Sequence, residues 1–164
     1  MAVTTEIQPY GAEHHDGVVA LMAVLQDYER ELSSDRPPGN EIAAGHFSYL
    51  LGVCERSGGQ VFVARQDQQV CGFAVLITES EDVGDLHLYP EYKTWGLVTD
   101  LCVAADYRGQ GIATRLMEAA EAHCRDLGLA RILVTALAEN HLARDSYARQ
   151  GYRLAEVTFY KALK

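Results

Sequence analysis

The chain has 164 residues, the length of one globular domain. Hydrophobic residues make up 48% of it and charged residues 23%, a balance that excludes intrinsic disorder, a collagen-like repeat and a coiled coil. The formal net charge of −9 argues against a general nucleic-acid-binding role. The charge is unevenly spread, because residues 1–106 carry 5 basic and 17 acidic side chains whereas residues 107–164 carry 9 and 6. This asymmetry indicates that the two parts contact partners of different charge.

Hydrophobic periodicity and turn residues predict one α/β (α+β) domain, residues 1–164, with a mixed sheet. The predicted elements, in chain order, are a strand at 4–9, helices at 18–32 and 40–56, an antiparallel hairpin of 61–65 and 70–78, an acidic and aromatic loop at 79–93, a strand at 95–103, a glycine-rich turn at 108–114, a helix at 112–127, a strand at 132–135, a helix at 140–150 and a final strand region at 152–163. Asn40 is expected to cap the second helix, and Gly128 to end the third.

The termini, cysteines and histidines give further expectations. The first seventeen residues lack the basic and apolar regions of a secretory signal, and no apolar run approaches the ~18–20 residues of a membrane span. None of the four cysteines forms a C-x-x-C pair, so we expect reduced thiols in a cytoplasmic protein. The six histidines are scattered, so we expect no metal site.

The glycine-rich turn is the strongest chemical signal. It lies between a strand and a helix, where backbone N–H groups and the helix dipole attract an anion, and its small residues allow a phosphate to approach. A P-loop is excluded because no lysine occurs between Lys93 and Lys161. A dinucleotide fingerprint is disfavoured, because Thr114 replaces its third glycine and residues 131–136 offer no carboxylate. A plain strand–helix turn without a ligand is the remaining alternative.

The turn also resembles a known family motif. R-x-x-G-x-A, formed by Arg108, Gly111 and Ala113, is similar to the acyl-CoA pyrophosphate motif of the GNAT superfamily of N-acetyltransferases. Residues 101–103 (L-C-V) precede it, and N-x-x-A-x-x-x-Y-x-x-x-G-Y at 140–152 looks like the second signature of that family. The hairpin at 61–74 also matches the family's central strands.

This resemblance implies a fold and a cofactor. The fold would be a mixed, mostly antiparallel sheet of about six or seven strands flanked by four helices, with splayed central strands. Acetyl-CoA would be the co-substrate, with no metal, and a homodimer is plausible from family habit. The residues implied to bind the cofactor are Leu101, Cys102, Val103, Arg108, Gly109, Gln110, Gly111, Ile112, Ala113, Thr114 and Asn140. Arg115 is a further candidate for the pyrophosphate, both arginines could instead be solvated, and Asn140 could merely cap its helix.

The resemblance implies catalytic residues as well. Tyr147 would hydrogen-bond to or protonate the leaving thiolate, although it could instead be a core tyrosine. A backbone N–H near Leu101 or Cys102 would stabilise the oxyanion. Asp100 resembles an acidic position common in small-amine acetyltransferases and is the first candidate for the general base. Glu79 and Glu81 are the alternatives.

The acceptor is expected to be a small cationic amine. Carboxylates in the loop at 79–93 alternate with aromatic residues including Tyr92 and Trp95, and both kinds of side chain attract cations. A protein N-terminus or lysine is a second possible acceptor, and a non-catalytic domain that binds acyl-CoA is a third reading.

Overall fold

Five strands and four α-helices form the fold in the computed structural model, which describes residues 4–164. The elements are β1 (Glu6–Pro9), α1 (His15–Leu32), α2 (Gly39–Ser57), β2 (Gln60–Gln66), β3 (Gln69–Ser80), β4 (Thr94–Val103), α3 (Ile112–Asp126), β5 (Ile132–Val134) and α4 (His141–Arg149). Short 3₁₀ turns precede α1, β4 and α3. None of these helices combines the length and the apolar composition needed to cross a membrane.

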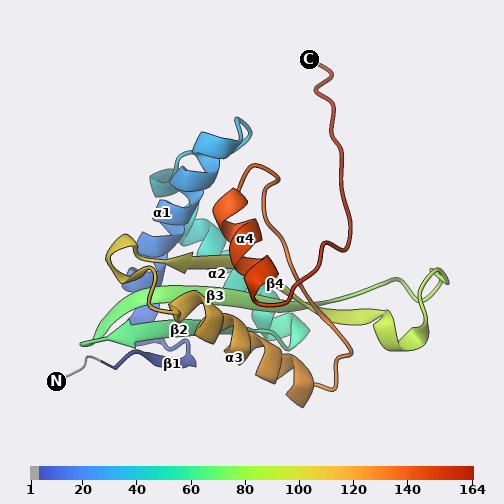
Figure 1. Cartoon of the computed structure of the whole chain (residues 1–164), viewed down its shortest axis with the longest axis horizontal. Coiled ribbons are helices and arrows are strands. Elements are labelled where there is room, and N and C mark those ends of the chain that lie inside the picture. The colour runs from blue at the N-terminus through green and yellow to red at the C-terminus, as the bar shows by residue number, and fades with distance from the viewer. Residues whose placement is uncertain (1–3) are drawn as a thin grey trace.

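The strands form one sheet in the order β1-β2-β3-β4-β5 (Figure 1). All neighbours are antiparallel except β4 and β5, which are parallel. The mixed, mostly antiparallel sheet and its four flanking helices are therefore confirmed, with five strands instead of six or seven.

The predicted final strand at 152–163 is wrong for the single chain. These residues leave the end of α4 and run away from the body of the molecule, and they pair with none of the described strands (Figure 1). A strand needs a neighbouring backbone to satisfy its N–H and C=O groups, so a β-type sequence without such a neighbour stays irregular.

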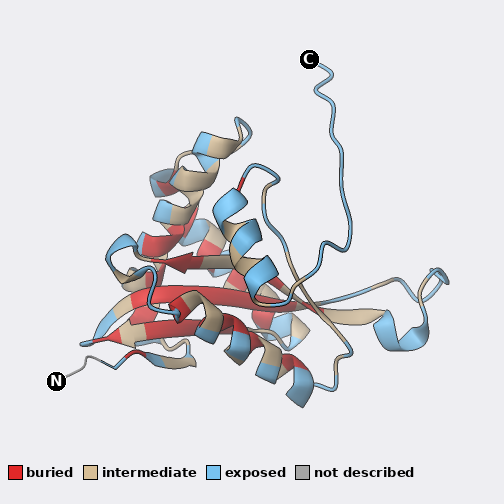
Figure 2. Cartoon of the chain, viewed as in Figure 1, coloured by how far each residue is buried: buried red, intermediate tan, exposed pale blue. Residues whose placement is uncertain are grey.

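Helices cover both faces of the sheet. On one face α1 and α2 pack through Val18, Met22 and Phe47 against Phe73 and neighbouring strand residues. On the other face α3 packs through Leu116, Met117 and Ala120. Figure 2 shows the buried residues along the sheet and on the helix surfaces that face it, whereas α4 is largely exposed.

The start of α2 differs from expectation. The helix begins at Gly39, whose N–H donates to Asp27 Oδ1 at 2.7 Å, and Asn40 lies inside its first turn. A side chain at position 39 would collide with the Ala23 carbonyl, so glycine allows α1 and α2 to approach closely here. The expected end of α3 is confirmed, since Gly128 follows it with a φ of +71°.

A bulge in β4 determines on which face of the sheet Asp100 lies. Val75 pairs with Asp100 but Leu76 pairs with Val98, so Thr99 is an extra residue in β4. In a regular strand Val98 and Cys102 would lie on the same face, because they are an even number of residues apart. Here Val98, before the bulge, packs on the α3 side, and Cys102, after it, packs on the α1–α2 side. The extra residue therefore moves Asp100 to the face covered by α1 and α2.

The two parallel strands separate immediately after this point. Pairing between β4 and β5 runs from Gly96 and Ile132 to Val98 and Val134 and stops there. Residues 99–103 of β4 continue without β5 beside them, which is the splaying expected from the resemblance.

Candidate active site

A cleft of about 820 Å³ opens between β4, the start of α3, α4 and α1. Ten of the eleven residues predicted to bind the cofactor line it: Leu101, Cys102, Val103, Arg108, Gly109, Gly111, Ile112, Ala113, Thr114 and Asn140. Gln110 is the exception, because its side-chain oxygen accepts a hydrogen bond from Gln66 Nε2 at 3.1 Å.

The floor of the cleft is the glycine turn. Gly109 and Gly111 both have φ near +75°, a left-handed conformation that side chains other than glycine rarely adopt. The first helical hydrogen bond of α3 runs from Arg115 N to Gly111 O at 3.1 Å. The amides of Ile112, Ala113 and Thr114 precede that bond and lie at the positive end of the helix dipole. The turn is thus shaped to receive an anionic group from the cleft.

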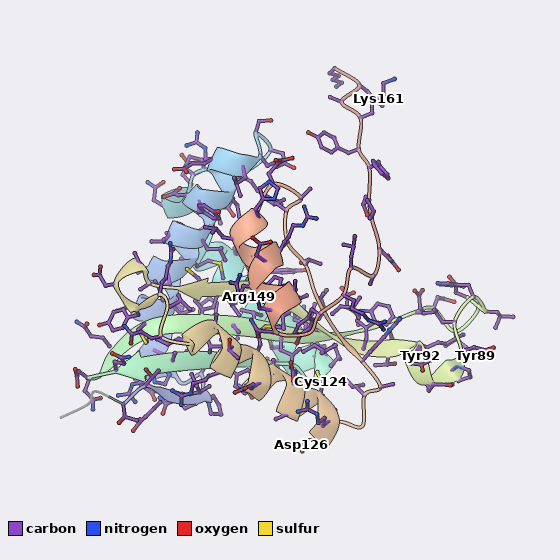
Figure 3. All side chains as sticks on the ribbon, in the orientation of Figure 1. Tyr89, Tyr92, Cys124, Asp126, Arg149 and Lys161 are labelled. Atoms are coloured by element: carbon purple, nitrogen blue, oxygen red, sulfur yellow. The ribbon has the colours of Figure 1, made fainter. Side chains whose placement is uncertain are left out.

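Three arginines differ in how they relate to the cleft. Arg108 lines it and donates from Nε to Val103 O at 3.1 Å, which holds the guanidinium beside the end of β4. Arg115 donates to Thr5 O at 2.9 Å, so this side chain is bonded to the residue before β1 and does not line the cleft. Arg149, which the sequence analysis missed, lines the cleft from the last turn of α4 (Figure 3).

A smaller cavity of about 80 Å³ adjoins the cleft at its inner end. The two spaces share five lining residues, Leu25, Leu101, Asn140, Ala143 and Ser146. The smaller cavity, but not the cleft, is also lined by Tyr147, Asp100, Thr99 and Glu29. The structure therefore brings the predicted catalytic pair, Tyr147 and Asp100, to one small space beside the cleft.

Tyr147 projects into this cavity from α4. Burial, with the nearby carboxylates of Glu29 and Asp100, raises the pKa of its phenol to about 12. The hydroxyl therefore keeps its proton at neutral pH and can donate it.

Two titratable side chains from the helices lie near Asp100. Its Oδ1 lies 3.7 Å from Nε2 of His46 in α2, and the Asp100 carboxylate raises the pKa of that imidazole. Glu29 of α1 is half-buried, and burial raises the pKa of its carboxyl group despite the opposing effect of Arg36. Two carboxylates thus line the cavity, and the imidazole of His46 lies beside one of them.

Asn140 has a structural role. Its Oδ1 accepts hydrogen bonds from Ala143 N at 3.1 Å and from the Tyr28 hydroxyl at 3.5 Å. It caps α4 and ties it to α1, while it also lines both spaces.

The acidic loop at residues 79–93, here called the lobe, lies elsewhere. It projects from the far end of β3 and β4, and Figure 3 shows its Tyr89 and Tyr92 well away from Arg149. Glu79 is four residues beyond Val75, the partner of Asp100, which is about 13 Å along the strand. Neither Glu79 nor Glu81 lines either space.

The aromatic side chains of the lobe region already hold a cation. The Arg131 guanidinium lies 5.3 Å from the centre of the Trp95 ring and 5.6 Å from that of Tyr92. Carboxylate oxygens of Glu81 and Asp85 lie with a nitrogen of His87 within 4.8 Å of one another, but the group is mostly exposed and contacts neither cavity.

The four cysteines are free and buried. Cys102 lines the cleft, and burial raises the pKa of its thiol to about 11. It is therefore an uncharged thiol at neutral pH and a poor nucleophile.

Sequence comparison gives a family match over most of the chain. The model described as the acetyltransferase (GNAT) family matches residues 19–152, which include the glycine turn and both predicted catalytic residues. A search of curated proteins gives no match.

Solved structures share the fold at low sequence identity. The BH1408 protein from Bacillus halodurans is 18% identical with a TM-score of 0.80, over 96% of this chain and 99% of that one. The aminoglycoside N-acetyltransferase AAC(6')-Iy in complex with CoA is 16% identical with a TM-score of 0.72, over 100% of this chain and 98% of that one. A glucosamine-6-phosphate N-acetyltransferase from Arabidopsis thaliana is 14% identical with a TM-score of 0.66, over 98% of this chain and 99% of that one.

Proposed function

Because the chain belongs to the acetyltransferase (GNAT) family, we propose that it transfers an acetyl group from acetyl-CoA to the primary amine of a small cationic molecule. One observation carries this proposal. Tyr147 and Asp100 line the same cavity of about 80 Å³, which adjoins the larger cleft that ends at the glycine turn. The proton donor Tyr147 and the proton acceptor Asp100 therefore lie together. Their cavity is where an acetyl-CoA molecule in the cleft and an amine in the cavity would meet.

The cleft suits acetyl-CoA in size and chemistry. Its volume lies in the range of cofactor sites, ~300–1,000 Å³. The pyrophosphate would lie against the amides of Ile112, Ala113 and Thr114, with Arg108 and Arg149 adding positive charge. The pantetheine arm would run beside residues 101–103, which have no β5 neighbour. A structural neighbour was solved in complex with CoA, which supports acyl-CoA as the co-substrate.

Acetyl-CoA, when bound, supplies a thioester whose carbonyl carbon an amine can attack. Glu29 and Asp100 would bind the incoming ammonium group, and the pair of Asp100 and His46 would take its proton. As the C–N bond forms and the C–S bond breaks, Tyr147 would donate its proton to the departing sulfur. A backbone N–H at Leu101 or Cys102 would stabilise the negative charge on the acetyl oxygen.

Direct transfer between two bound substrates fits this site better than an acetylated enzyme. Cys102 is the only cysteine, among residues 4–164, that lines the cleft. Its raised pKa leaves it protonated, and no base among the described residues hydrogen-bonds to its sulfur.

The acceptor is inferred from the small cavity. Two carboxylates favour a cation, and the volume of about 80 Å³ admits an aminomethyl group but little more. Structural neighbours are named as N-acetyltransferases of aminoglycosides and of glucosamine-6-phosphate, which supports a small-molecule acceptor.

A panel of amines with acetyl-CoA, followed by the release of free CoA, tests the proposal. We expect turnover with polyamines, aminoglycosides or cationic amino acid derivatives, and at least tenfold lower kcat/KM with neutral or acidic amines. A preference for peptide N-termini or lysines would overturn the acceptor assignment. Calorimetric binding of acetyl-CoA with no turnover on any amine would overturn the enzymatic one.

A further inference from the structure

Gln66 is a buried amide at the end of a row of apolar side chains. Phe62 and Ala64 of β2 belong to the core on the α3 side of the sheet, and alternate residues of a strand share a face. Gln66 is the next residue of this row and is only 8% exposed, and α3 lies across this face of the sheet (Figure 1). A buried amide costs free energy unless it is hydrogen-bonded, so the fold has to supply partners at this position.

Both N–H groups of that amide are used. Gln66 Nε2 donates to Thr5 Oγ1 at 2.6 Å and to Gln110 Oε1 at 3.1 Å. Thr5 is the residue before β1 and is also buried. Gln110 belongs to the glycine turn, between Gly109 and Gly111. The amide of Gln66 thus joins the start of β1 and the end of β2 to the turn that precedes α3.

The crest of the glycine turn has few contacts of its own. A side chain built at Gly109 or Gly111 would meet no atom within 4 Å, so the turn is not packed against the body of the molecule at these positions. The N–H groups of residues 109–111 donate to no backbone carbonyl within residues 4–164. The conformation of the crest therefore depends on contacts made by the side chains next to these glycines.

Two side chains anchor the turn on either side of the amides of residues 112–114. Before these amides, Gln110 is bonded to Gln66. After them, Arg115 Nη1 donates to the carbonyl oxygen of Thr5 at 2.9 Å. Because Gln66 is bonded to Thr5 as well, both anchors end at the same buried residue. This closed network fixes the turn relative to the sheet at the point where the pyrophosphate would lie.

We propose that Gln66 is a positioning residue for acetyl-CoA, because it holds the glycine turn in the conformation that receives the pyrophosphate. This inference rests on the proposed use of acetyl-CoA. Gln66 does not line the cleft, so its effect passes through Gln110. A turn that is ordered before the cofactor arrives loses less conformational entropy on binding, which strengthens binding. The cavity of Tyr147 and Asp100 shares no lining residue with this network, so the chemical step should not depend on it.

Calorimetric titration of the full chain with CoA is the first test. Gln66→Leu removes both N–H donors and keeps a side chain of similar size, and we expect the Kd for CoA to rise about tenfold. The KM for acetyl-CoA should rise in parallel, with kcat within about twofold of wild type. Gln60→Leu is the matched control, because Gln60 lies about 20 Å away at the other end of β2 and its Nε2 donates to Val61 O. Its Kd should equal that of wild type.

Gln110→Ala tests the same link from the side of the turn. Gln110 is exposed, so this variant keeps the proposal testable even if circular dichroism shows that Gln66→Leu is unfolded. Gln110→Ala should also raise the Kd for CoA. The double variant should bind CoA no more weakly than Gln66→Leu alone, because the two changes remove one link. With S-acetylpantetheine, which lacks the pyrophosphate, Gln110→Ala and wild type should have equal kcat/KM.

The contrary results distinguish this inference from the proposed function. A wild-type chain that binds neither CoA nor acetyl-CoA would overturn the proposed function and this inference with it. A wild-type chain that binds CoA, with Gln66→Leu and Gln110→Ala within about twofold of its Kd, would overturn the positioning role alone. Variants that lose kcat with S-acetylpantetheine as strongly as with acetyl-CoA would also overturn it, because the loss would then come from a general loosening of the fold.

Discussion

Replacement of Tyr147 by phenylalanine is the sharpest test of the proposed chemistry. With a pKa of about 12, the phenol is protonated at pH 8 by a ratio of roughly 10⁴ to one, so almost every enzyme molecule has the proton to donate. General acid catalysis contributes roughly 10²–10⁴-fold, which is roughly 2.7–5.4 kcal/mol of the activation barrier. We therefore expect kcat of Tyr147→Phe to fall by that factor, with a much smaller change in KM for acetyl-CoA.

The assay is steady-state release of CoA between pH 6 and pH 10, with an amine that the wild type accepts. Tyr152→Phe is the matched control, because its ring lies 6.1 Å from that of Tyr147 but its hydroxyl bonds to Glu121 and lines neither space. The control should keep kcat within about threefold. The raised pKa also implies that ionisation of Tyr147 does not lower wild-type activity below pH 10. A Tyr147→Phe enzyme with kcat within about threefold of wild type across this range would refute the acid role.

Three further predictions concern the base, the glycine turn and the imidazole. Asp100→Asn should lower kcat/KM by roughly 100-fold or more, while Glu79→Gln changes it less than twofold, and equal losses would contradict the placement of the base. Gly111→Ala forces a side chain to a φ of +75°, so it should cost about 1–2 kcal/mol of unfolding free energy and weaken acetyl-CoA binding by calorimetry; an unchanged urea midpoint would argue against this. The raised pKa of His46 means that its pairing with Asp100 stabilises the fold fully below about pH 6.5 and loses this effect as the pH rises through the raised value. The Tm advantage of wild type over His46→Gln should therefore shrink between pH 5.5 and pH 9, and a constant difference would contradict it.

Local patterns were sufficient to predict most of the fold. The helices from His15 and Ile112 and the hairpin of β2 and β3 follow from the spacing of apolar residues and from the turn residues between them. The glycine turn could also be predicted, because its φ angles depend on residue types that are adjacent in the chain.

The acceptor side could not be predicted in the same way. Glu29 and His46 occupy ordinary polar positions of amphipathic helices, and only the packing of α1 and α2 on the sheet brings them to Asp100. Conversely, Trp95 and Tyr92 were interpreted as contacts for a cationic substrate, but the fold supplies Arg131 from 36 residues beyond Trp95. Both differences come from contacts between residues distant in the sequence.

The missing final strand has a similar cause. Residues 152–163 alternate as a strand does, but whether such a segment becomes one depends on a free edge within reach. Composition and periodicity describe the segment alone and carry no information on where that edge lies.

The extra residue in β4 has a consequence for how related sequences are compared. Because Thr99 shifts the alternation of the strand by one, the location of the Asp100 carboxylate depends on the number of residues in β4 as well as on their identity. In a β4 of regular alternation, the residue two positions after the counterpart of Val98 would face α3, as Val98 does, and only the residue directly after it would face α1 and α2. An aspartate two positions after that valine is therefore equivalent to Asp100 only in homologues that share the bulge, and in homologues without it the equivalent residue directly follows the valine.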